Sequence, residues 1–109
     1  MNRVSIGDMR QRLVLEQPDF ISDGGGGVEE TWLVVAELWA AMKPLTGAER
    51  VEAEAVAGRV SHEVWLRYRD GVTSEMRFRL GNRFLDIRAV IDVDEKGRFL
   101  KCLAEERDL

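Results

Sequence analysis

The sequence predicts a mainly β protein, a small antiparallel β-barrel or sandwich of about six strands with one inserted α-helix at about residues 47–57. Three observations support this fold class. Apolar and polar residues alternate over several short segments, as they do in strands that bury one face. The alternation stops between Glu37 and Arg59, where good helix formers follow one another. Short turn signals separate the remaining segments, which is typical of small barrels and sandwiches.

The length and composition are those of a small globular domain. A chain of 109 residues is expected to form a single domain, residues 1–109, with a modest core. Its 45% hydrophobic and 33% charged residues indicate a soluble protein. No apolar run approaches the ~18 to 20 residues of a membrane helix, and residues 1–12 lack the apolar core of a signal peptide. We therefore expect residence in a cytoplasm and no contact with a membrane.

The first strand is expected at residues 12–17, ending at Pro18 because proline cannot donate to a strand ladder. A flexible, exposed loop is then expected at about residues 18–30. This loop has four consecutive glycines directly after Asp23: Gly24, Gly25, Gly26 and Gly27. So many glycines give the backbone too much freedom to hold one form cheaply.

A second, long strand is expected at residues 31–42. Its even-numbered residues are all apolar and should face the core: Trp32, Val34, Ala36, Leu38, Ala40 and Met42. Trp39 then lies on the opposite face, which also carries Glu37 and Lys43.

The helix is expected to begin at a capping box, in which Thr46 and Glu49 satisfy each other's backbone N–H groups. Gly58 stands where a left-handed residue usually ends a helix. The predicted apolar side holds only small residues: Ala48, Val51, Ala55 and Val56. Such a face buries little area, so the helix is either lightly docked on the sheet or completed by something outside the chain.

Four further strands are expected at residues 60–69, 75–80, 84–93 and 99–105. In the first of them, alternation directs four side chains to one face: His62, Val64, Leu66 and Tyr68. Gly81-Asn82 is a two-residue hairpin signal, and residues 94–97 supply another turn.

No catalytic residue, metal site or cofactor is expected. Cys102 is the only cysteine, so it cannot form an internal disulfide, and its alternating position makes it a small core residue. His62 is the only histidine and is expected to be half buried in its strand. The glycine run lacks the Lys-Ser/Thr pair of a phosphate-binding loop.

Charge is unevenly distributed along the chain. Residues 16–30 hold five acidic residues and no basic one, whereas residues 59–90 hold seven arginines against four acidic residues. A solvated surface of mixed sign is the commonest explanation. Four arginines are predicted on the outward face of two consecutive strands that should pair: Arg67, Arg69, Arg77 and Arg79. This basic ribbon, with Trp65 at one end, could bind nucleic acid or an acidic partner. A nucleic-acid track would normally have exposed aromatic residues among its basic ones, and only Trp65 qualifies, which favours the partner.

Two tryptophans, Trp39 and Trp65, are core residues if the helix covers them and interface anchors if it does not. The acidic loop around Asp23 and the arginine ribbon suggest a head-to-tail ring of identical copies, in which the loop of one copy lies on the ribbon of the next. The polar residues of the helix, Glu49, Arg50 and Glu52, are further candidates for an interface.

Several segments, in this order, resemble the head-tail joining (head closure) proteins of tailed bacteriophages and gene transfer agents. They are IGDMRQR at 6–12, DGGGG at 23–27, LWAAMKPLTGAE at 38–49, HEVWLRYRDGV at 62–72, MRF at 76–78 and GNRFLDI at 81–87. The resemblance covers almost the whole chain and is most specific in the segment at 38–49.

The resemblance implies a non-enzymatic connector of a virion or gene transfer particle, assembled in the bacterial cytoplasm. It implies a homo-oligomeric ring in the particle neck, between the portal or adaptor ring of a DNA-filled capsid and the tail terminator or tail tube protein. Double-stranded DNA would pass through its lumen without sequence-specific binding. Some family members gate the channel with a loop, for which this chain offers Gly24 to Gly27 and the turn at Asp70-Gly71. The alternatives are a barrel that binds single-stranded nucleic acid through Trp65 and the arginines, and a tail terminator or completion protein.

Overall fold

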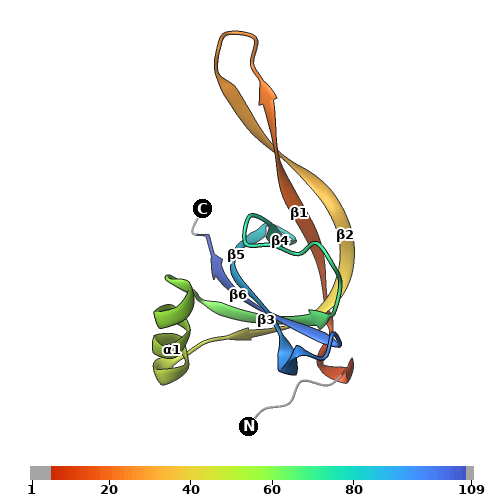
Figure 1. Ribbon diagram of the computed structural model, residues 1–109, viewed down its shortest axis with the longest axis vertical. Coiled ribbons are helices and arrows are strands. Elements are labelled where there is room, and N and C mark those ends of the chain that lie inside the picture. The colour runs from red at the N-terminus through yellow and green to blue at the C-terminus, as the bar shows by residue number, and fades with distance from the viewer. Residues whose placement is uncertain (1–5, 108–109) are drawn as a thin grey trace.

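The computed structural model describes residues 6–107 and contains one closed barrel of antiparallel strands (Figure 1). The strands are β1 (Gln11–Ser22), β2 (Val28–Pro44), β3 (His62–Arg67), β4 (Arg77–Leu80), β5 (Arg83–Asp92) and β6 (Phe99–Glu106), in the barrel order β1-β2-β3-β6-β5-β4. The helix α1 (Gly47–Ala57) joins β2 to β3, and the short 3-10 turns η1 (Ile6–Asp8) and η2 (Val93–Glu95) precede β1 and follow β5. The predicted fold class is confirmed, with a barrel in place of a sandwich.

The core fills the inside of the barrel. Every strand contributes alternate side chains to it, chiefly Leu13, Leu15, Ala40, Val64, Leu66, Phe78, Leu85, Ile87, Leu100 and Cys102. The alternation predicted for residues 60–69 is confirmed at Val64 and Leu66, and Cys102 is the small core residue that was expected. Closing the sheet on itself leaves no free strand edge within the barrel.

A two-stranded arm projects from this barrel (Figure 1). β1 pairs with β4 only at residues 14–16, and β2 pairs with β3 only at residues 40–44. Residues 17–34, which we call the arm, therefore have strand partners only within the β1–β2 hairpin. The molecule measures 53 × 27 × 26 Å, and its radius of gyration of 14.8 Å exceeds the roughly 13 Å of a compact chain of this length.

The arm corrects the predicted end of the first strand and the predicted loop at 18–30. β1 continues through Pro18, which lies opposite Trp32, and only residues 23–27 form the turn. Proline is tolerated because β1 has a neighbour on one side only beyond Glu16. Asp23 holds the turn, since its Oδ1 accepts hydrogen bonds from the N–H groups of Gly25 and Gly27 at 2.8 and 3.0 Å. The flexibility of this segment stays a prediction.

A β-bulge marks the point where the arm leaves the barrel. Leu15 pairs with Ala36 and Glu16 with Val34, so Val35 is the extra residue. Below the bulge the predicted core face of β2 is correct, because Ala40 is buried and Leu38 packs against the core. Above it the prediction is wrong, because Val34 is 60% exposed on the arm.

The helix has the predicted bounds but neither the predicted cap nor the predicted packing face. Gly58 ends the helix with a positive φ of 76° and donates its N–H to the carbonyl of Glu54, although its ψ of -147° lies outside the left-handed helical region that was predicted. Thr46, however, makes no side-chain capping bond, and the Glu49 carboxylate accepts from the Lys43 ammonium instead. The two partners lie six residues apart across the strand-helix junction, and a charged donor makes the stronger hydrogen bond.

The side of α1 that packs on the barrel is formed by Ala53 and Ala57, which contact a small cluster of Leu45, Val60 and Leu103. The predicted apolar side faces outward instead: Ala48, Val51, Ala55 and Val56 are all exposed. No residue of α1 is buried. The helix is thus lightly docked, one of the two alternatives that its small side chains left open.

The turn between β4 and β5 lies where it was predicted. The hairpin turn predicted at Gly81-Asn82 joins β4 to β5, with Gly81 at a φ of 59°. Within residues 6–107, no helix has the length and apolar character needed to span a membrane.

Candidate functional site

The single cysteine and the single histidine of the chain both lie on strands of the barrel, Cys102 on β6 and His62 on β3. Cys102 is fully buried, and burial raises the pKa of its thiol to about 12. His62 is half buried, as predicted, with its Nδ1 2.8 Å from the Ser61 hydroxyl. Burial lowers the pKa of His62, although the Glu106 carboxylate opposes this. No group of three or more His, Cys, Asp or Glu side chains in the described chain could hold a metal ion.

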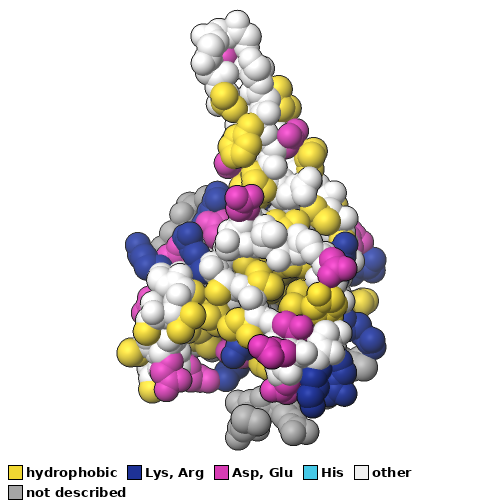
Figure 2. All heavy atoms as spheres, in the orientation of Figure 1, with side chains coloured by type: hydrophobic (Ala, Val, Ile, Leu, Met, Phe, Trp, Pro, Cys, Tyr) yellow, Lys and Arg dark blue, Asp and Glu magenta, His cyan; other side chains and the backbone are white. Residues whose placement is uncertain are grey.

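The arm carries many of the large exposed apolar side chains of residues 6–107 (Figure 2). Five of them lie on the arm itself and a sixth, Val35, lies at the bulge; the five are Phe20, Ile21, Val28, Leu33 and Val34. Acidic residues stand among them at Asp19, Asp23, Glu29 and Glu30, and no Lys or Arg occurs between Arg12 and Lys43. A concentration of exposed apolar side chains of this kind often marks an interaction surface.

A largely buried ionic cluster fixes the base of the arm to the barrel. Glu16, only 5% exposed, accepts hydrogen bonds from Arg77 Nε at 2.8 Å and from Arg79 Nε at 3.1 Å. The Arg77 guanidinium also lies 3.9 Å from the ring centre of Trp32 and 4.3 Å from that of Phe84. Because these contacts join β1, β2, β4 and β5, they hold the direction in which the arm leaves the barrel.

The predicted arginine ribbon is wrong. β3 pairs with β2 and β6, whereas β4 pairs with β1 and β5, so the two strands are not neighbours. Arg77 and Arg79 are used within the fold, by Glu16. Arg67 and Arg69 lie elsewhere, at the end of β3. The prediction is wrong because it requires these consecutive strands to pair, whereas the chain crosses from β3 to β4 at a different place in the barrel, between β1 and β5.

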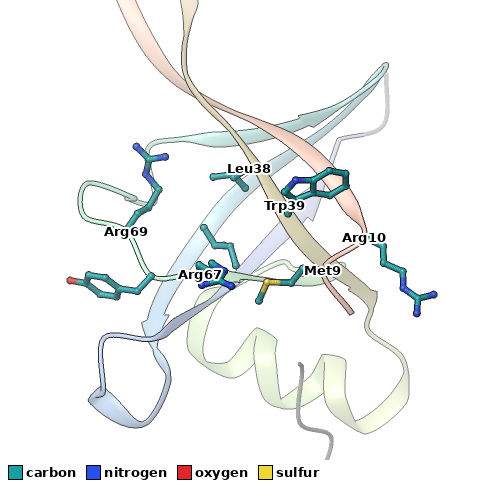
Figure 3. A pocket seen from close by; sticks show the side chains of 8 residues that line it. Met9, Arg10, Leu38, Trp39, Arg67 and Arg69 are labelled. Carbon is teal, nitrogen blue, oxygen red and sulfur yellow. The ribbon is translucent and has the colours of Figure 1, made fainter. Parts of the chain in front are cut away.

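A groove of about 670 Å³ opens beside the barrel (Figure 3). It is lined by Met9, Arg10, Leu38, Trp39, Leu66, Arg67, Tyr68 and Arg69, and we call it the basic groove. Its floor is apolar, since Leu66 and Met9 are buried, and Trp39 lines it while 56% exposed. Figure 3 shows Met9, Leu38 and Trp39 between Arg69 on one flank and Arg10 on the other.

Within residues 6–107, the arginines of the basic groove have no acidic side chain within 4 Å. The Arg10 side chain donates to the carbonyl of Gly7, at 2.9 Å. Arg12, just outside the groove, is paired with Glu37 and lies 5.7 Å from the Trp39 ring centre. The groove is thus an apolar hollow with three uncompensated positive charges around it.

The other predicted site residues lie away from the groove or beside it. Trp65 is partly buried, donates to Glu63, and is not covered by α1, which packs on another cluster. Asp70 accepts a hydrogen bond from the Tyr68 hydroxyl at 2.9 Å, and because Tyr68 lines the groove, this turn borders it. Gly71 in the same turn has a φ of 83°. Of the α1 candidates, Glu49 is paired with Lys43, while Arg50 and Glu52 are exposed. Of the predicted site residues, the basic groove therefore brings together Trp39, Arg67 and Arg69.

Sequence reasoning missed two sets of residues: the apolar side chains of the arm, and five residues of the groove, namely Met9, Arg10, Leu38, Leu66 and Tyr68. The apolar character of the arm could have been found in the sequence, because Phe20, Ile21 and Val28 flank the glycine turn on both sides. The groove had no such signal in the linear sequence, since three separate segments form it.

Comparisons with known proteins relate the chain to a phage protein family and to a gene transfer agent particle. A family model described as phage head completion protein matches residues 4–107. A chain in the virion of a native gene transfer agent particle is 30% identical, with a TM-score of 0.66, over 90% of this chain and 94% of that one. Protein SF1141 from Shigella flexneri 2a is 24% identical, with a TM-score of 0.75, over 94% of this chain and 96% of that one, a likeness of fold. No curated protein sequence matches.

Proposed function

Because the chain belongs to the phage head completion protein family, we propose that it is a structural head-tail connector, which closes the DNA-filled head and joins it to the tail. The observation that carries the proposal is the family match over residues 4–107, supported by the 30% identical chain of a gene transfer agent virion. The protein acts without enzymatic activity, as an adaptor or a stopper in the neck of a phage or gene transfer particle.

The connector works as a homo-oligomeric ring between the portal or adaptor ring and the tail terminator or tail tube protein. Two exposed surfaces favour assembly, namely the apolar, acidic arm and the basic groove with Trp39. Tryptophan is a frequent interface anchor, because it supplies a large apolar area at low entropic cost. The outward apolar side of α1, with Val51 and Val56, offers a third contact surface.

Double-stranded DNA passes through the lumen without sequence-specific binding. The net charge of -4 supports this role, because an acidic wall repels phosphate and lets DNA slide. The loops that could restrict the channel are the tip at Gly24 to Gly27 and the turn at Asp70-Gly71. The separation of Arg67 and Arg69 from Arg77 and Arg79 disfavours the alternative of a single-stranded nucleic-acid track.

Deletion and complementation of the gene test this function. Without the protein, we expect DNA-filled heads that lack tails or lose their DNA, and restoration of tailed particles by the unmodified chain. The Trp39→Ala variant should fold but restore fewer tailed particles, whereas Trp39→Phe keeps an aromatic anchor and should restore more. Tailed, DNA-containing particles in normal number after deletion would refute the proposal.

A further inference from the structure

The arm and the basic groove of this chain are complementary to each other in charge and in apolar character. We propose that the arm of one copy lies in the basic groove of a second copy, an inference that rests on the proposed assembly of the chain with itself. In the predicted ring the acidic segment bound the arginine ribbon; in the proposed contact the same segment binds the basic groove.

The charges match in sign, and most of them have no close partner of opposite charge within residues 6–107. On the arm, Asp19, Glu29 and Glu30 have no basic side chain within 4 Å there, although Glu30 lies near enough to Arg107 to help raise the pKa of that guanidinium. In the groove, Arg10, Arg67 and Arg69 have no acidic side chain within 4 Å among the same residues. Most other arginines of the described chain are paired: Arg12, Arg59, Arg77, Arg79, Arg83, Arg88 and Arg107. Complementary potentials of this kind orient and select a partner.

The apolar surfaces match as well. Near the tip of the arm, Phe20, Ile21 and Val28 are 63%, 49% and 67% exposed, although all three are apolar. The groove offers apolar walls at Leu38 and Trp39. The groove can therefore accept an apolar side chain of the arm in its hollow while its arginines face the acidic neighbours of that side chain.

The geometry requires that the arm and groove come from different copies. Trp39, in the groove, and Val28, near the tip, belong to the same strand and are eleven residues apart, which is roughly 35 Å of extended chain. An arm fixed at its base by Glu16 and Arg77 cannot fold back over that distance. It can, however, extend across a neighbouring barrel, which is about as wide as the 27 and 26 Å short axes.

The contact is heterologous, because the surface used on one copy differs from the surface used on the next. Such contacts repeat head to tail and close into a ring when the rotation allows it. Each copy would give one arm and receive one, so a closed ring leaves no arm uncovered.

Cross-linking between two purified variants tests the contact. Val28→Cys places a thiol on the arm and Tyr68→Cys places one in the groove, while the buried native Cys102 stays unreactive. Mixed and treated with a short bismaleimide, these variants should give about tenfold more linked dimer than Val28→Cys mixed with Val56→Cys, an exposed site on α1. Equal yields from the two mixtures, or no linked dimer from either, would overturn the contact.

Charge reversal gives a second readout. Arg67→Glu with Arg69→Glu in the groove copy should abolish the linked dimer, and Glu29→Arg with Glu30→Arg in the arm copy should restore it. A yield that does not respond to reversal of the groove charges would contradict the proposal.

The same cysteine pair, built into one chain and cross-linked in assembled particles, separates this inference from the proposed function. A ladder of linked copies from the particle neck supports both. Linkage of the arm cysteine to a different neck protein, in particles that do contain this chain, overturns the arm-groove contact and leaves the connector function standing. Absence of the chain from the neck overturns the connector function, whatever the purified variants do.

Discussion

The Nε of Arg77 lies 2.8 Å from Oε1 of Glu16, which joins β4 to β1 at the residue where the arm leaves the barrel. Glu16 is 5% exposed, and the Arg77 side chain is 11% exposed. Glu16→Gln removes the charge that compensates both Arg77 and Arg79, and we expect it to lower the free energy of unfolding by about 3 kcal/mol. Urea denaturation followed by tryptophan fluorescence measures the loss.

The matched control is Glu37→Gln, which removes the partner of Arg12 in an exposed ion pair with side chains 61% and 55% exposed. A surface pair of this kind contributes little, so a change below about 1 kcal/mol is expected. Equal effects of the two substitutions would show that the cluster around Glu16 does not fix the base of the arm.

Cys102 should be inert in the folded protein. Burial raises the pKa of its thiol to about 12, so the reactive thiolate is roughly one part in ten thousand at pH 8. A thiol reagent at pH 8 is expected to label the native chain very slowly and to label it fully in guanidinium. Rapid stoichiometric labelling without denaturant would mean that the barrel opens readily at β6.

His62 should titrate below its ordinary value. Burial favours the neutral imidazole and lowers the pKa of His62, against the opposing effect of Glu106. Because the unfolded chain takes up this proton at a higher pH than the folded chain, the histidine's contribution to stability is complete above about pH 6.5 and is lost as the pH falls through the lowered pKa. NMR can follow this only histidine of the chain directly, and a midpoint above that of the urea-unfolded protein would contradict the sign.

The helix α1 should be the first element to open in an isolated subunit. It contacts the barrel through Ala53 and Ala57 and has no buried residue, whereas β3 and β6 line the core. Amide exchange measured by mass spectrometry is therefore expected to be faster across α1 than across either strand. Protection of α1 equal to that of β6 in a monomeric sample would show that the helix is more firmly docked than its contacts indicate.

Local signals in the sequence predicted the elements of this fold well. Gly58 and the helix formers before it place α1 at its observed bounds, and Gly81-Asn82 places the β4–β5 turn, because these features depend on backbone conformation over a few residues. The same locality explains the error at Pro18. Whether a proline interrupts a strand depends on the neighbour that its missing N–H would face, and that neighbour is far away in the sequence.

The candidate site was predicted only in part, for the same reason. Arg67 and Arg77 have the same outward alternation in their segments, yet the first lies in an open groove and the second stacks between Trp32 and Phe84. Only the barrel order, in which β4 lies beside β1, distinguishes them. Alternation placed Trp39 on the half-polar face of its strand but left open whether the helix covers it, and the structure leaves it 56% exposed.

Cryo-electron microscopy of the particle neck would show directly whether this chain forms the connector. We expect a ring of rotationally arranged copies between the portal side and the tail, with the arm of each copy lying in the basic groove of its neighbour. A neck in which density for this chain is absent, or in which single copies stand without contact to one another, would contradict it.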